Sequence, residues 1–372
     1  MKGKIRESFA ALLVVLTLAG CGEWTDAEAL DYETHGIAGT PHNEAYYANL
    51  REYKRNKRHS VAFGWYSDWS GVGTQMTSQL MGLPDSMDFV SMWGNWHGLT
   101  PEKKEDLRRV QQIKGTKVLM CFIIDDIGAQ TTPPEIEETL TVDGTKYATV
   151  GEARAAFWGW YHNTSTGEIF GDNTPEGMDR AIRKYAGSLL DTIRKYGWDG
   201  FDFDLEPGFG HGGNIASFPD RIHIVLDELS KELGPLSGTD KLLCVDGEPY
   251  QLQGEDALKC DWFLIQAYND TDDSQIDGRM QRLFSAFSGY LTQEEVLSKT
   301  VLCSNFESYG STGGPSYTTR DGEQTNQLTG YAKYYHPDVN GRIGGVGAFR
   351  MGFDTNYRYM RAAIGVLNPV AK

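Results

Sequence analysis

Cysteine, positive charge and long apolar runs are all scarce in this chain of 372 residues. The five cysteines include no CxxC pair, so the sequence offers neither a cysteine-rich metal site nor an evident disulfide framework. Lys and Arg number 35 against 51 Asp and Glu, and the net charge of -16 argues against nucleic acid or an anionic membrane surface as a partner. No apolar run is long enough for a transmembrane helix.

Four of the cysteines, Cys121, Cys244, Cys260 and Cys303, lie within or beside apolar runs typical of strands. We expect them to be free thiols that pack as small hydrophobic side chains. A disulfide between Cys244 and Cys260 is an alternative that the sequence leaves open. We expect no metal and no cofactor.

The first twenty residues have the composition of a targeting segment. Lys2, Lys4 and Arg6 precede an apolar run over residues 9–19, which is too short to cross a bilayer. The run ends in Leu-Ala-Gly-Cys21, which resembles the lipobox of bacterial lipoproteins. This resemblance implies lipidation of Cys21 and a surface-exposed lipoprotein of the bacterial outer membrane, held by its lipid anchor. An ordinary secreted protein is the alternative.

Strand-like and helix-like segments alternate through most of the chain and predict an α/β fold, a single (β/α)8 barrel with elaborated loops. We expect a signal peptide over residues 1–20, a polar lead-in over 21–55 and the barrel over 56–372. The expected strands span 60–65, 88–93, 117–124, 200–206, 242–245, 262–268, 300–304 and 344–351. The expected helices span 174–196, 218–233, 281–287, 324–335 and 357–367.

Three acidic residues, Asp202, Asp204 and Glu206, alternate with apolar residues in the fourth expected strand. Side chains alternate between the two faces of a strand, so the three carboxylates share one face. Like charges raise each other's pKa values, so a strand that keeps such a set is suited to acid–base chemistry. A solvated strand face and a divalent metal site are the alternatives. Asp199 has the opposite parity, and we expect it to be structural.

The full run, Asp199-Gly-Phe-Asp202-Phe-Asp204-Leu-Glu206, resembles the DGxDxDxE signature of family 18 glycoside hydrolases. The resemblance implies a barrel and a retaining hydrolysis in which the 2-acetamido group of the sugar is the nucleophile. Glu206 would then be the general acid. Asp204 would orient the acetamido group, which closes to an oxazolinium ion, and Asp202 would share a proton with Asp204.

The sixth expected strand narrows the resemblance. Tyr268 matches the tyrosine that binds the acetamido carbonyl, whereas Gln266 and Asn269 depart from the chitinase pattern. These departures are similar to bacterial, Bacteroides-type endo-β-N-acetylglucosaminidases, which cut the chitobiose core of N-glycans. The implied partners are N-glycans and glycoproteins, and we expect a monomer. A chitinase-like hydrolase and a non-catalytic glycan-binding lipoprotein are the alternatives.

Gln266 and Asn269 are expected to bind substrate. Other residues at strand ends are expected to do the same, namely Trp65, Asn95, Trp96 and Met351. We expect the long segments 130–173 and 310–322 to shape the cleft. The stretch 208–213 fits the dinucleotide pattern GxGxxG, but the acids that precede it would repel a pyrophosphate.

Overall fold

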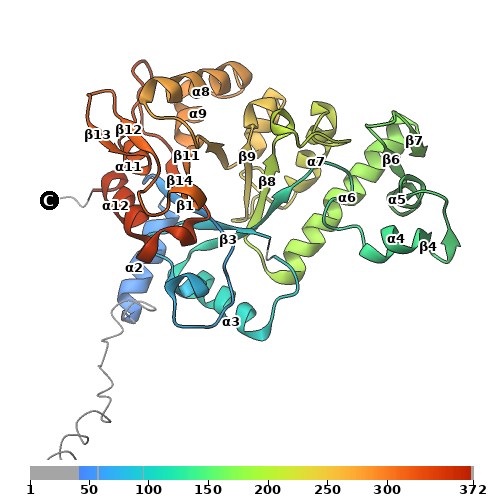
Figure 1. Cartoon of the computed structure of the whole chain (residues 1–372), viewed down its shortest axis with the longest axis horizontal. Helices are drawn as coiled ribbons and strands as arrows, with labels where there is room; N and C mark the ends of the chain where they lie inside the picture. The colour runs from blue at the N-terminus through green and yellow to red at the C-terminus, as the bar shows by residue number, and fades with distance from the viewer. Residues whose placement is uncertain (1–41, 57, 95, 370–372) are drawn as a thin grey trace, which may run out of the picture. The chain divides into compact units, whose positions relative to one another are not determined.

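Eight parallel strands close into a barrel in the computed structural model, which describes residues 42–56, 58–94 and 96–369 (Figure 1). The strands are β1 (Val61–Tyr66), β2 (Phe89–Trp93), β3 (Lys117–Ile123), β8 (Gly200–Leu205), β9 (Leu242–Gly247), β10 (Trp262–Gln266), β11 (Thr300–Asn305) and β14 (Gly345–Phe349). Around the barrel they follow this same order, and β14 pairs with β1. Every expected strand is present within one or two residues of its ends, which confirms the barrel.

α-Helices follow most, but not all, of the barrel strands. The described α-helices are α2 (Glu44–Arg55), α3 (Pro101–Arg109), α4 (Pro134–Thr139), α5 (Val150–Trp158), α6 (Pro175–Tyr196), α7 (Pro219–Leu229), α8 (Asp273–Ala286), α9 (Gln293–Lys299), α10 (Phe306–Tyr309), α11 (Gln327–Lys333) and α12 (Arg358–Leu367). The fully described connections from β1 to β2 and from β9 to β10 contain only 3-10 helices. Two of these, η5 (Pro249–Gln251) and η6 (Gly254–Lys259), follow β9.

Three helices differ from expectation at their N-termini, and one of them, α11, begins at Gln327 rather than at residue 324 because residues 324–326 form a strand. Helix α2 lies in the segment expected to be a polar lead-in, where Asn43 caps it and Arg51 donates a hydrogen bond to Ile113 O at 2.9 Å. Helix α8 begins at Asp273 rather than at residue 281, because the side chain of Asp272 accepts the first free N–H groups. The starts of α2 and α8 carry an Asn or Asp cap, which is the signal that the apolar pattern alone misses.

Apolar side chains form two layers separated by the barrel wall. The inner layer fills the barrel and includes Phe63, Trp65, Cys121 and Leu264. The outer layer lies between the strands and the helices and contains most of the buried residues. All four cysteines of the described segments are free and buried, so the alternative disulfide is not formed.

The long segment between β3 and β8 forms a separate group of elements beside the N-terminal end of α6, on the right in Figure 1. It contains α4, α5 and two antiparallel hairpins, β4–β5 (Thr141–Val142, Thr145–Lys146) and β6–β7 (Trp160–His162, Ile169–Gly171). A third hairpin, β12–β13 (Ser316–Thr318, Gln324–Asn326), follows β11. Both insertions follow the C-terminal ends of strands, where barrel enzymes carry their sites.

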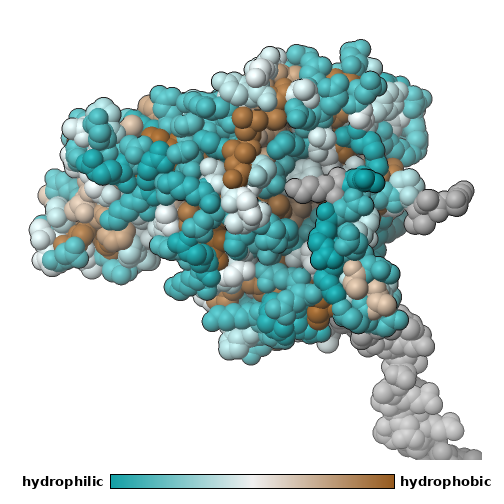
Figure 2. Space-filling view, turned by 180° about the vertical axis from the view of Figure 1, so that it is seen from behind, coloured by the Kyte–Doolittle hydropathy of each residue, from teal (hydrophilic) through white to brown (hydrophobic). Residues whose placement is uncertain are grey.

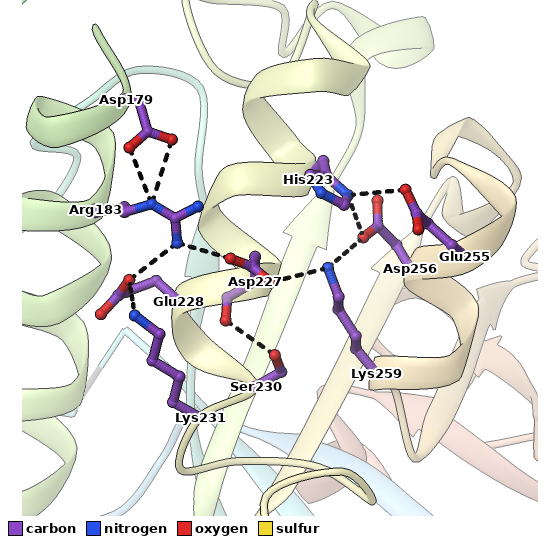
Figure 3. Close-up of polar contacts among 10 residues, drawn as sticks. All are labelled: Asp179, Arg183, His223, Asp227, Glu228, Ser230, Lys231, Glu255, Asp256 and Lys259. Carbon is purple, nitrogen blue, oxygen red and sulfur yellow. Dashed lines mark hydrogen bonds and ion pairs between the residues drawn. The ribbon is translucent and has the colours of Figure 1, made fainter. Parts of the chain in front are cut away.

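A chain of charges on the outside of the barrel joins α6, α7 and η6 (Figure 3). Its buried member is Asp256, whose Oδ1 lies 2.9 Å from both His223 Nδ1 and Lys259 Nζ. At the other end Arg183 pairs with Asp179 and Asp227. The network therefore compensates a fully buried carboxylate with cations, which is the usual condition for burying a charge.

The surface of the face in Figure 2 is largely hydrophilic, with hydrophobic residues in separate patches. Within the described segments, no helix has the length and apolar character needed to span a membrane.

Candidate active site

The acidic ladder lies on β8 with its carboxylates inside the barrel. Asp202 and Asp204 are buried on the inner face, while the apolar residues between them pack outward against the helices. Glu206 follows the last residue of the strand and is partly exposed. The alternation that the sequence predicts therefore places two buried carboxyl groups below a third at the barrel mouth.

Asp202 is held by two neutral donors. Its Oδ2 accepts hydrogen bonds from Trp65 Nε1 at 3.1 Å and from Ser91 Oγ at 2.7 Å. Burial raises the pKa of Asp202 to about 6, although these donors oppose the rise by stabilising the carboxylate. Asp202 is therefore a carboxyl group that changes charge close to neutral pH.

Asp204 lies between Asp202 and the barrel mouth and is 2% exposed. Its Oδ1 is buried and has no hydrogen-bond partner. Burial raises the pKa of Asp204 well above its usual range, and the adjacent negative charges of Glu206 and Asp202 add to the effect. Asp204 Oδ1 is therefore an unsatisfied polar atom within the site, as is Asp202 Oδ1.

Gln266 and Tyr268 reach the ladder from β10. Gln266 Nε2 donates hydrogen bonds to Glu206 Oε1 at 2.5 Å and to Asp246 Oδ1 at 2.8 Å. Tyr268 follows the end of the strand, is partly buried and packs its ring against Phe349 at 6.0 Å. Burial raises the pKa of its hydroxyl well above the usual value, so Tyr268 stays a hydrogen-bond donor at neutral pH.

Asp246 on β9 is a site residue that the sequence indicated only as one of several polar residues at strand ends, without a role. The expected strand ended at residue 245, just before Asp246, but β9 continues to Gly247. Asp246 is consequently inside the barrel, fully buried and directly opposite Asp204 in the strand register. Burial raises the pKa of Asp246 well above its usual range, and the negative charges of Asp204 and Asp202 raise it further.

The residues expected to bind substrate fall in different places. Trp65 is buried beneath the ladder, so its ring positions Asp202 and offers no exposed face. Trp96 packs on Phe122, with ring centroids 5.3 Å apart, in the outer layer. Met351 is also in the outer layer. Both residues lie beyond the ends of their strands, Trp96 after β2 and Met351 in a 3-10 helix after β14, and their side chains pack in the outer layer rather than in the barrel interior.

Met351 contacts the strand at Gly64, where an added Cβ would lie 2.4 Å from Met351 Sδ. Asn269 is exposed next to Tyr268 and is free to meet a ligand. Asn95 and Cys21 lie outside the described residues.

The glycine-rich loop after Glu206 is fixed by carboxylate and amide contacts. Glu248, at the end of β9, accepts hydrogen bonds from Gly208 N and from the hydroxyl of Tyr250. Asn214 is fully buried, accepts from Ile127 N at 2.8 Å and donates to His162 O at 2.9 Å. A carboxylate therefore occupies the place at which a dinucleotide loop would bind phosphate, and Asn214 joins the loop to the β6–β7 hairpin.

The hydrogen-bond donors around the acidic residues distinguish a divalent metal site from a set of carboxyl groups that share protons. One oxygen each from Asp204, Glu206 and Asp246 lie within 4.8 Å of one another, which is close enough for a small cation. However, the amide of Gln266 donates hydrogen bonds to two of these three side chains. Donor hydrogens directed at these oxygens favour a proton-sharing set over a cation site.

A protein-family model and several solved structures match this chain. Residues 25–366 match the family model described as glycoside hydrolase family 18, BT1044-like. The chain belongs to this family. The chain is also 30% identical to a solved selenomethionine-labelled variant of the Bacteroides protein BT1044, with a TM-score of 0.71. The match covers 89% of this chain and 94% of that one. Among curated proteins, none matches.

More distant structures share the fold. The endo-β-N-acetylglucosaminidase of Cordyceps militaris, solved in its apo form, is 21% identical with a TM-score of 0.53 and covers 89% of this chain and 98% of its own. A mutant of the same enzyme, solved with fucosyl-N-acetylglucosamine-Asn, is 19% identical with a TM-score of 0.53. The predicted family is therefore confirmed, and the chain is a glycoside hydrolase by family.

Proposed function

We propose that this family 18 glycoside hydrolase is an endo-β-N-acetylglucosaminidase that cuts the β-1,4 bond of the chitobiose core of N-glycans. The observation that carries the proposal is the position of Gln266, whose amide contacts Glu206 at the barrel mouth. Gln266 is one of the two residues of this segment, with Asn269, at which the chain departs from the chitinase pattern. The likeness to the Cordyceps enzyme, which is named for this activity, is consistent with the proposal.

The ladder supports a retaining, substrate-assisted reaction. Glu206, at the mouth, protonates the leaving glycosidic oxygen. Asp204 presents its unpaired Oδ1 to the N–H of the substrate acetamido group, whose carbonyl oxygen then attacks the anomeric carbon. Tyr268 donates its hydroxyl to that carbonyl, and Asp202 supports Asp204 from below. Water opens the oxazolinium ion after Glu206 has become the base, so the product keeps its configuration.

A macromolecular substrate fits an enzyme at the cell surface. The proposal includes cleavage of the signal segment, lipidation of Cys21 and anchoring of a monomer to the bacterial outer membrane. Its partners are then glycoproteins carrying N-glycans, and no cofactor is required by the chemistry. Radiolabelled palmitate incorporation that is lost in Cys21→Ser tests the anchor, and no incorporation into the parent would contradict it.

Glycan release tests the activity. The protein is incubated with ribonuclease B, which carries high-mannose glycans, and with an antibody, which carries complex glycans. We expect mass loss that leaves one N-acetylglucosamine on an unchanged asparagine. Glu206→Gln keeps an oxygen for Gln266 and should lower the rate by about 10²- to 10⁴-fold. Asp199→Asn is the matched control, because Asp199 directly precedes the same strand but accepts a hydrogen bond from Val118 N outside the site.

The anomeric configuration of the first product and the cleavage of chito-oligosaccharides distinguish the proposed reaction from its alternatives. Proton NMR of the first product should show the β-anomer, whereas an initial α-anomer would contradict the oxazolinium route. Cleavage of chito-oligosaccharides without glycoprotein release would favour the chitinase-like alternative. Glycan binding without turnover by the parent would favour the non-catalytic one.

A further inference from the structure

A fourth carboxyl group completes the ladder from the neighbouring strand. In the register between β8 and β9, Asp246 is the partner of Asp204, and Cys244 is the partner of Asp202. Asp246 therefore points into the barrel at the level of Asp204. It belongs to two close groups of side chains, one with Asp204 and Glu206 and one with Asp202 and Cys121. Asp246 thus connects the lower and upper parts of the site.

The two hydrogen-bond donors that contact Asp246 are neutral groups. Its Oδ1 accepts from Gln266 Nε2 at 2.8 Å, and its Oδ2 accepts a weak hydrogen bond from Cys121 Sγ at 3.9 Å. In the described segments, no Lys, Arg or His forms an ion pair with Asp202, Asp204 or Asp246. Three buried carboxyl groups without a cation keep their charge low by retaining protons.

Asp256 differs from the three buried carboxyl groups inside the barrel in its contacts with cationic side-chain types. Asp256 is also fully buried, but His223 and Lys259 surround it (Figure 3). Outside the barrel, the chain therefore places a lysine and a histidine against a buried carboxyl group. Inside the barrel it supplies Gln266, which is a neutral donor.

We propose that Asp246 is a positioning residue, which in its protonated form donates a hydrogen bond to Asp204 and, through Gln266, also orients Glu206. Asp246 then sets the orientation of both Asp204 and Glu206, the two carboxyl groups that contact the substrate. The inference rests on the proposed function for its kinetic consequences, whereas the proton on Asp246 does not depend on it. The groups that face Asp246 are Cys121 from β3, Asp202 and Asp204 from β8, Glu206 just after β8, Cys244 from β9, Gln266 from β10, Tyr268 just after β10, and Cys303 from β11.

Two substitutions test the proposal. Asparagine has one donor and one acceptor, like protonated aspartic acid, so Asp246→Asn should keep both contacts and lose at most about fivefold in kcat. Asp246→Leu removes both contacts and should lower kcat by about 10²-fold with KM changed less than about threefold, because the acid and the orienting carboxyl move out of line. In the pH profile of kcat, the loss of activity on the alkaline side should occur at higher pH in Asp246→Asn than in the parent, because the asparagine amide does not lose its proton. Equal losses in the two variants would overturn the proposal.

An infrared measurement decides the proton independently of turnover. At neutral pH the difference spectrum of the parent minus Asp246→Asn should contain the C=O stretch of a protonated carboxyl group. Asp256→Asn is the matched control, because it removes a fully buried but ion-paired carboxylate and should remove no such band. A difference spectrum for Asp246→Asn without the band would overturn the proposal. A parent that shows the band but cleaves no glycan would refute the proposed function alone.

Discussion

Replacing Asp202 by asparagine should stabilise the protein more at alkaline than at acidic pH. Burial raises the pKa of Asp202 from 3.8 to about 6. The folded state therefore holds this proton more tightly than the unfolded state, so stability falls as the pH rises between these two values. A shift of about two units corresponds to about 3 kcal/mol at pH 8, none of which applies to a neutral asparagine.

The assay is thermal unfolding of the parent and Asp202→Asn between pH 4.5 and 8. For a unit of about 330 residues, 3 kcal/mol corresponds to a difference in Tm of about 4 °C. About 1 kcal/mol of this effect is already present at pH 4.5, because the unfolded carboxyl is largely ionised there, so the advantage of Asp202→Asn should grow by about 2 kcal/mol, or about 3 °C, between the two ends of the range. Ser91→Ala is the opposite control, since it removes a donor to the carboxylate and should destabilise more at pH 8 than at pH 4.5. Parallel Tm curves for parent and Asp202→Asn would refute the reasoning.

Two further substitutions test the loop that follows Glu206. Gly208→Ala places a Cβ 2.4 Å from Glu248 Oε1, so kcat should fall by about tenfold or more, while Gly187→Ala, whose Cβ meets open space, should leave kcat unchanged. Asn214→Ala leaves the buried Ile127 N–H without its acceptor and should lower the free energy of unfolding by about 3 kcal/mol. Denaturation and steady-state kinetics measure both effects, and normal values in either variant would show that the loop is not held by these contacts.

Much of the barrel could be predicted from the sequence because most of its strands are short, largely apolar runs and β8 shows the period of two of a strand. The outer helices were less predictable. Helix α2 is polar on most positions, and its start depends on the cap at Asn43. Two connections use 3-10 helices, which have no strong apolar period. Tertiary packing against the barrel supports these elements, and that contribution is not visible in the local sequence.

The sequence by itself determined the parity and order of Asp202, Asp204 and Glu206, because they belong to one strand and the period of a strand is two. It also carried the family signature. Only the tertiary structure decided that Asp246 stands beside Asp204 and that Gln266 joins Asp246 to Glu206. Those contacts join three different strands, and their closeness depends on the register of the closed sheet, which no local pattern encodes.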